Sequence, residues 1–241
     1  MSQGGRVPPI GPDATVVEIA AATGSLCSMP QGHSTRRLLL WPSLLTLAIS
    51  LARLVLEVQG SVSTASGGRL LPLGITWGIF VFGGWFGRRL SLQNDTPRVR
   101  LGWLWALLAL LAAIGTAVSG FRPLVGADTS EATFAQLRTA VLTTAIVTSL
   151  AAAAMFAVWP RLAWTLLLYG LGARATVLAS TWLAKHQGWD THYTKFGPSG
   201  IEQETMAATM ASAGIAQLGF WVPFTIVGGT LCGCLLARRS R

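Results

Sequence analysis

Residues 162–184 read LAWTLLLYGLGARATVLASTWLA, and Arg174 is the only charged side chain in this run. A helix of about 20 apolar residues crosses the hydrocarbon core of a bilayer, so the run predicts a membrane-spanning helix with an arginine near its middle. A charge at that depth costs several kcal/mol unless it has a partner or a polar cavity. Arg174 is therefore the first candidate for a functional residue.

The composition extends this interpretation to the whole chain. Of 241 residues, 51% are hydrophobic and only 11% are charged, and the mean hydropathy is +0.53. Ordinary soluble domains are more polar than this. The formal net charge is +9, but most basic residues flank apolar runs, where they set topology. We therefore expect a membrane protein with membrane lipids as partners and no nucleic acid.

The fold class we expect is all-α, a polytopic membrane helix bundle with six transmembrane helices. Residues 1–37 are rich in Gly, Pro, Ser and Thr and lack the pattern of a signal peptide, so they predict a flexible N-terminal extension. Residues 38–241 form the transmembrane domain, in which residues 185–200 are a loop before the last span. The predicted spans are residues 38–58, 71–87, 101–120, 139–158, 162–184 and 207–236.

The distribution of Lys and Arg predicts the orientation. With the N-terminus inside, the inner segments hold eleven basic residues and the outer segments five. Cytoplasmic loops carry the excess of positive charge, so both termini are expected in the cytoplasm and the loop 185–200 at the outer face. The localisation we expect is the cell membrane, specifically a bacterial inner membrane.

Arg53 is the second arginine within a predicted span, and Glu57 follows it by one helical turn. Residues at i and i+4 can form an ion pair, but Glu57 is the only acidic residue in any predicted span and can equally neutralise Arg174. Both alternatives stay open. Either the charges form an internal ion pair that fixes helix packing, or the arginines line a cavity for an anion or a lipid phosphate, which a guanidinium binds through two oxygens.

The outer loop reads KHQGWDTHYTKFGPSG over residues 185–200. Trp189, Asp190, His192 and Tyr193 are expected to fold over the bundle as a lid. His186, Asp190 and His192 are metal-ligand types, but their spacing matches no common zinc site. They are weak candidates only, and we predict no metal, cofactor or catalytic residue.

Two features of the last span concern its packing. Pro223 removes a backbone hydrogen bond and frees the carbonyl of Gly219, which predicts a kink. Paired glycines at 228–229 match a pair at 83–84 in the second span, and both runs continue to paired arginines. This similarity indicates either parallel copies of a helical hairpin, as in many transporters, or chance.

Three functions remain as hypotheses. The first is a non-enzymatic bundle or an accessory subunit that assembles with other membrane subunits. The alternative is a small permease or lipid-binding protein that takes an anionic group into an outward-facing cavity lined by Arg53 and Arg174. The third is an outer-face metal-dependent enzyme, which is the least favoured because common nucleotide-binding and hydrolase motifs are missing.

Overall fold

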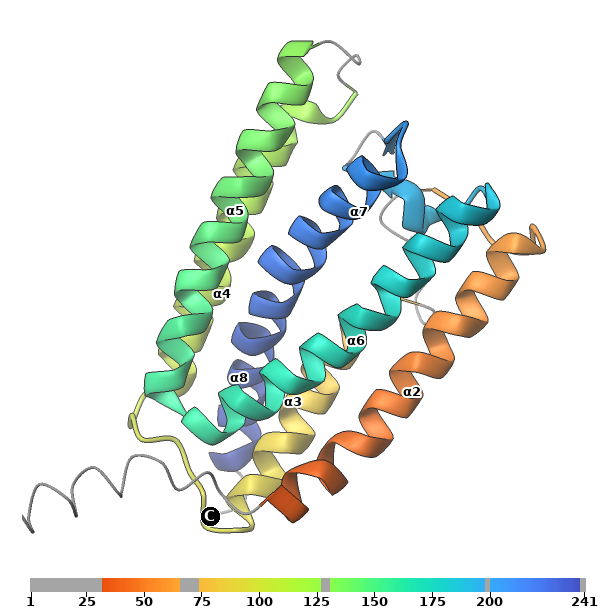
Figure 1. Cartoon of the computed structure of the whole chain (residues 1–241). Coiled ribbons are helices and arrows are strands. Elements are labelled where there is room, and N and C mark those ends of the chain that lie inside the picture. Colours follow the sequence, from red (N-terminus) through yellow and green to blue (C-terminus); the bar gives the residue numbers. More distant parts are fainter. Residues whose placement is uncertain (1–31, 66–73, 127–130, 198–199, 239–241) are drawn as a thin grey trace, which may run out of the picture. The chain divides into compact units, whose positions relative to one another are not determined.

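The computed structural model describes residues 32–65, 74–126, 131–197 and 200–238 (Figure 1). From Arg37 onward these residues belong to one compact unit. The predicted N-terminal extension, residues 1–37, lies almost wholly outside the described residues, so it stays a prediction.

Helices account for most of the described chain. The long helices are α2 (Gly32–Val58), α3 (Thr76–Ser91), α4 (Gly102–Phe121), α5 (Glu131–Val158) and α6 (Pro160–Gln187). The last helical stretch has three parts in sequence, α7 (Met206–Gly214), the π-helical segment η3 (Ile215–Trp221) and α8 (Val222–Arg238). The connections hold the short elements η1 (Arg122–Leu124), η2 (His192–Thr194), β1 (Lys195–Phe196) and β2 (Ile201–Glu202).

The helices form an up-and-down bundle with α8 at its centre. Helices α2, α4 and α6 run in one direction and α3, α5 and the α7–α8 stretch run in the other (Figure 1). Helix α8 contacts α3, α4, α5 and α6. Helices α4 and α5 pack together as a hairpin on one side. Helix α2 lies on the other side, where Thr46 is hydrogen-bonded to the Tyr169 hydroxyl group of α6 at 2.9 Å.

Five helical stretches are long and apolar enough to cross a membrane, so the chain is a multi-pass membrane protein. They are Arg37–Val58, Gly102–Leu124, Ala135–Val158, Pro160–Gln187 and Met206–Ala237, and they match five of the six predicted spans. The span predicted at 71–87 differs. Helix α3 covers Thr76–Ser91 with 16 residues, a rise of about 24 Å, against a hydrocarbon core of about 30 Å. Residues 66–73 lie outside the described part.

Helices α3 and α8 cross in direct backbone contact. A Cβ atom on Gly83 would lie 2.3 Å from the Cα atom of Gly229, and one on Gly87 would lie 2.3 Å from the Cα atom of Gly233. Small residues spaced by four allow membrane helices to approach this closely. One glycine of each pair compared in the sequence, Gly83 and Gly229, therefore meets the other, in two helices that run in the same direction.

Pro223 shapes the centre of the last helical stretch. Proline cannot donate to the carbonyl four residues earlier, and the carbonyl of Gly219 instead accepts a hydrogen bond from Ser149 Oγ of α5 at 3.3 Å. The distortion takes the form of the π-helical segment η3, which ends where the Val222 amide donates to the carbonyl of Gln217. π-Helical turns inside α-helices are frequent at functional sites.

Candidate functional site

A cavity of about 250 Å³ lies between α2, the start of α3, α6, η3 and the loop that follows α6. Part of its wall is apolar, with Ile75, Val177 and Trp221 among the lining residues. The polar part of its wall contains the basic side chains of Arg53, Arg174, His192 and Lys195 and the neutral polar residues Ser50, Thr76, Thr181 and Gln217.

Arg174 projects from the middle of α6 and is only 4% exposed. Its Nη1 donates one long hydrogen bond of 3.4 Å to Gln217 Oε1, and its Cζ atom lies 4.8 Å from the centroid of the Trp221 ring. Its Nε is buried without a hydrogen-bond partner. Within the described part of the chain, no carboxylate lies at ion-pair distance from Arg174. The charge of this buried arginine is therefore not compensated by any described residue.

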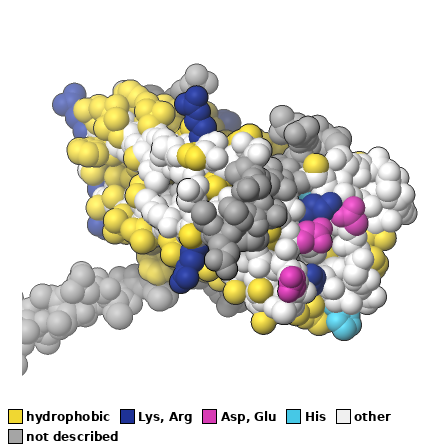
Figure 2. All heavy atoms as spheres, turned by 90° about the horizontal axis from the view of Figure 1, so that it is seen from above, with side chains coloured by type: hydrophobic (Ala, Val, Ile, Leu, Met, Phe, Trp, Pro, Cys, Tyr) yellow, Lys and Arg dark blue, Asp and Glu magenta, His cyan; other side chains and the backbone are white. Residues whose placement is uncertain are grey.

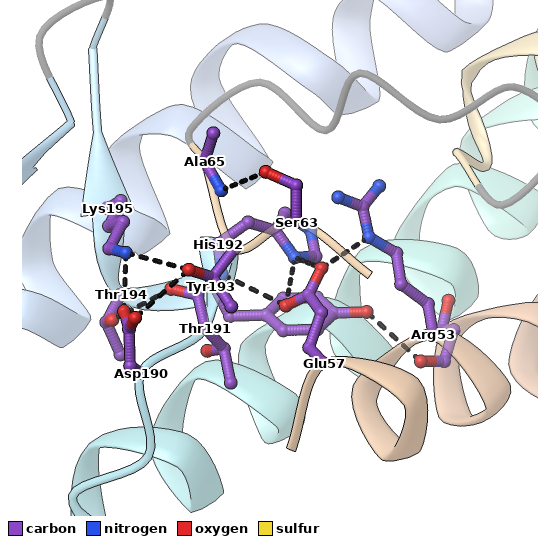
Figure 3. A network of polar contacts seen from close by, with 12 residues as sticks. Arg53, Glu57, Ser63, Ala65, Asp190, Thr191, His192, Tyr193, Thr194 and Lys195 are labelled. Carbon is purple, nitrogen blue, oxygen red and sulfur yellow. Dashed lines mark hydrogen bonds and ion pairs between the residues drawn. The ribbon is translucent and has the colours of Figure 1, made fainter. Parts of the chain in front are cut away.

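Arg53 has the partner that Arg174 lacks. Its Nε donates to Glu57 Oε1 at 2.8 Å, one turn further along α2, and both side chains are buried. The terminal nitrogens of Arg53 point away from Glu57 (Figure 3), and no hydrogen bond joins them to another described residue. Of the two sequence alternatives for Glu57, the structure contains the pair with Arg53 and not the pair with Arg174.

Glu57 also anchors the loop after α6. Its Oε2 accepts hydrogen bonds from the backbone amide of His192 at 3.0 Å and from the Nδ1 atom of His192 at 2.8 Å. The next residue, Tyr193, donates from its hydroxyl group to the carbonyl of Ser50 at 3.1 Å. These contacts join the loop to two positions of α2 about two turns apart, and they hold the loop against the cavity (Figure 3).

The solvent-exposed part of the loop carries a second ion pair. Lys195 forms a salt bridge with Asp190 and lies 3.2 Å from Thr64 Oγ1, while Thr64 Oγ1 donates to Asp190 Oδ2 at 3.0 Å. Figure 2 views the bundle from the end that carries this loop, and charged side chains gather there on the side of α2 and α6. Hydrophobic side chains dominate the opposite side, over α4 and α5.

The environments of three loop groups shift their pKa values. Burial lowers the pKa of His192, although the Glu57 carboxylate raises it, so the ring is neutral at neutral pH. The hydrogen bond from Lys195 lowers the pKa of Asp190. Burial raises the pKa of Tyr193 to about 12. At neutral pH the loop therefore contributes a cation and a carboxylate that match each other, and an uncharged imidazole.

The first turn of α3 completes the cavity. Gly74, Ile75 and Thr76 line it, and the helix has no side-chain cap at Ile75. A helix N-terminus carries unsatisfied amide groups and a partial positive charge, which together favour an anion. This end of α3 adds to the positive potential of the arginines.

The residues expected at the site fall into two groups. Arg53, Arg174, His192 and Tyr193 line the cavity. Trp189 instead packs beside Leu54, Val177 and Tyr193, and Asp190 pairs with Lys195 at the loop surface.

The weak metal candidates do not converge. His186 stacks on Trp182, whereas His192 binds Glu57 and Asp190 binds Lys195. No group of three or more ligand-type side chains occurs among residues 32–65, 74–126, 131–197 and 200–238.

Three contributors to the cavity were not expected from the sequence. Lys195 lies in the quoted loop, but only its backbone turn brings it to the cavity. Trp221 follows Gln217 by four residues, and both face Arg174, which the spacing alone could have suggested. The N-terminus of α3 was not expected in the cavity wall, because the predicted span 71–87 placed the start of this helix earlier in the chain.

Compared with protein-family models, with curated proteins and with solved structures, the chain matches none. The chemistry of the cavity therefore rests on its own groups. Arg53, Arg174 and Lys195 contribute three permanent cations, and the two carboxylates bonded to them are Glu57 and Asp190. One positive charge remains, and it belongs to Arg174.

Proposed function

We propose that this membrane protein binds an anionic group in the cavity lined by Arg53 and Arg174, as a small permease or lipid-binding protein. The group is an oxyanion of phosphate or sulfate type, either free or carried on a lipid headgroup. The observation that carries the proposal is the buried guanidinium of Arg174, whose Nε has no partner and whose charge meets no carboxylate among the described residues.

The energetics of burial support this proposal over a purely architectural role. A buried charge without a partner is strongly destabilising, whereas a matched internal pair is often replaceable. Arg53 with Glu57 is such a matched pair. An anion would supply the missing charge for Arg174, and a guanidinium binds two oxygens of one oxyanion at once.

The size and the remaining donors fit a small oxyanion. The cavity measures about 250 Å³, whereas one water occupies about 30 Å³ in the liquid, so an oxyanion with a few waters can be accommodated. Arg53 lines the cavity and uses only its Nε atom in the hydrogen bond to Glu57, and the N-terminus of α3 lies in the wall. Half-helix N-termini that point at anionic groups are a recurrent device in membrane transporters.

Thermal unfolding of the purified chain in detergent tests the proposal. Sodium sulfate should raise the unfolding temperature of the wild type more than that of Arg174→Leu, because a ligand at 100 times its Kd stabilises by about 2.7 kcal/mol, whereas the exclusion of sulfate from protein surfaces stabilises both proteins alike. Arg174→Leu should fold and lose this sulfate-specific shift. Arg88→Leu is the matched control, since Arg88 is exposed in the last turn of α3 and lies outside the cavity.

The outcomes also separate the two sources of the anion. A short-chain phosphatidic acid added in place of sulfate should stabilise the wild type more strongly if the group is carried on a lipid, and no more than sulfate if the cavity takes free ions. An unchanged sulfate shift in Arg174→Leu, or no shift in the wild type, would overturn the proposal and leave the assembly-subunit hypothesis.

A further inference from the structure

His192 lines the cavity, and one of its two ring nitrogens is hydrogen-bonded to a described residue. Its Nδ1 atom lies 2.8 Å from Glu57 Oε2, on a carboxylate that also accepts from Arg53. A carboxylate that already accepts from a guanidinium is ionised and can only accept, so the hydrogen-bond network assigns the proton of the neutral ring to Nδ1. Nε2 of this tautomer carries a lone pair and has no hydrogen-bond partner among the described residues.

A lone pair on a ring that lines the cavity opposes an anion bound there. Oxyanion oxygens are acceptors, and two acceptors repel, whereas a protonated imidazole donates from both nitrogens. We propose that the anion enters the cavity together with one proton, which His192 takes up at Nε2. This inference rests on the proposed anion site and deepens it, because it defines binding as the joint uptake of an anion and a proton.

The charges around the ring define the preferred ligand. Glu57 and Arg53 face it from α2, and Arg174 lines the same cavity from α6. Lys195 lies on the loop itself and is matched by Asp190. Tyr193, the other titratable neighbour, is neutral at ordinary pH. The described residues that α3 and η3 contribute to the lining are uncharged, with Thr76 and Gln217 as the polar side chains that can hydrogen-bond a ligand. The cluster has one uncompensated positive charge with a neutral ring and two with a protonated ring, so a dianion matches the protonated state.

The direction of the pH dependence follows from linkage. In the empty cavity burial keeps the pKa of His192 below its ordinary value of 6.5, whereas a bound anion raises it by favouring the charged ring. The complex therefore holds more protons than the free protein between these two pKa values, and affinity rises as the pH falls through that window. Full coupling of one proton corresponds to about tenfold in affinity per pH unit. Below the lower pKa both states are protonated and the affinity levels off.

Calorimetric titration of the detergent-purified chain with sodium sulfate measures the proton directly. Sulfate does not titrate near neutral pH, so proton uptake is obtained from the binding heat in two buffers of different ionisation enthalpy. The expected result at neutral pH is an uptake that approaches one proton per sulfate bound. Sulfate binding without proton uptake would overturn this inference and leave the anion site intact, whereas no binding would overturn both.

Matched histidine variants locate the proton. His192→Gln keeps a neutral polar side chain and should bind sulfate without proton uptake and without the pH dependence. His186→Gln is the control, because His186 is exposed and stacks on Trp182 away from the cavity, and its uptake should equal that of the wild type. If His192→Gln does not fold, the wild type and His186→Gln still test the inference. Proton uptake that is lost in His186→Gln would mean that His186, and not His192, takes up the proton, which would contradict the inference.

Discussion

The two halves of the bundle use α3 and the last helical stretch in opposite ways. In one half Gly83 and Gly87 bring α3 into backbone contact with α8, and the surrounding side chains, such as Phe86 and Leu166, are apolar and fully buried. In the other half α3 has only its first turn, and η3 with α2 and α6 encloses a cavity lined by basic groups. Close helix packing at one level thus accompanies an open polar site at the other.

The same contrast separates the two buried arginines. Arg53 is 6% exposed and Arg174 is 4% exposed, so both lose most of their hydration. Arg53 is neutralised by Glu57 within its own helix, whereas among the described residues Arg174 contacts the Gln217 amide and the Trp221 ring and no carboxylate. Burial alone therefore does not identify a ligand site in this protein. The charge that remains after internal pairing does.

The largest expected effect follows from filling the glycine contact. In Gly83→Val the new Cβ would lie 2.3 Å from the Cα atom of Gly229, a distance at which the two backbones must separate. Because cores tolerate overpacking poorly even when side chains alone are displaced, we expect no folded, monodisperse protein in size-exclusion chromatography. In the control Gly172→Val the new Cβ meets no atom within 4 Å, and stability should change by less than about 0.5 kcal/mol.

The Gly83 prediction also checks which half of the bundle holds the fold together. If Gly83→Val were purified as a monodisperse species with the unfolding temperature of the wild type, the close contact of α3 with α8 would be dispensable. The close contact of α3 with α8 could then not be the source of the stability that offsets the cost of burying Arg174 in the other half of the bundle.

The sequence predicted the fold to the extent that length and apolarity decide it. Five predicted spans agree with the structure because a run of about 20 apolar residues has few alternatives to a membrane helix. The second predicted span, 71–87, overlaps α3, which covers Thr76–Ser91, but its first residues lie outside the described part of the chain, so this span stays a prediction. The π-helical form of η3 was also missed, since Pro223 predicts a freed carbonyl but not how the backbone accommodates it.

The site was predictable in its residues but not in its pairing. Arg53, Glu57 and Arg174 were evident as charges in apolar runs, because such charges are costly in a membrane. The choice of partner for Glu57 depends on the rotation of α2 against α6 and on the fold of the loop that brings His192 to the same carboxylate. The spacing of Arg53 and Glu57 within one helix makes their pair possible, but it does not decide between Arg53 and Arg174 and does not predict the contact with His192.

The second prediction removes the difference between the two arginines. Glu57→Gln leaves Arg53 buried without its carboxylate and weakens the attachment of His192. Breaking a buried pair on one side costs about 3–5 kcal/mol, which should appear as a large fall in the unfolding temperature in detergent. Sulfate should recover part of this loss, because the anion now compensates both arginines.

The control for this variant is Glu202→Gln, which makes the same chemical change on an exposed residue of β2 and should leave the unfolding temperature unchanged. A Glu57→Gln protein as stable as the wild type would mean that Arg53 does not need its partner. In that case the contrast with Arg174 would lose its energetic basis.

The smallest expected effect concerns the surface pair of the same loop. Asp190 is bonded to Lys195, and its side chain is 69% exposed, so Asp190→Asn should cost at most about 1 kcal/mol and less at high salt. The hydrogen bond from Lys195 lowers the pKa of Asp190 below its ordinary value of 3.8, so the stabilisation is complete above that value and is lost as the pH falls through the folded-state pKa. The difference in unfolding temperature between the wild type and Asp190→Asn should therefore be small at pH 7 and vanish in strong acid. If Asp190→Asn destabilised the protein as much as Glu57→Gln, the loop would be held mainly by its exposed pair, and the buried carboxylate of Glu57 would not be what holds His192 at the cavity.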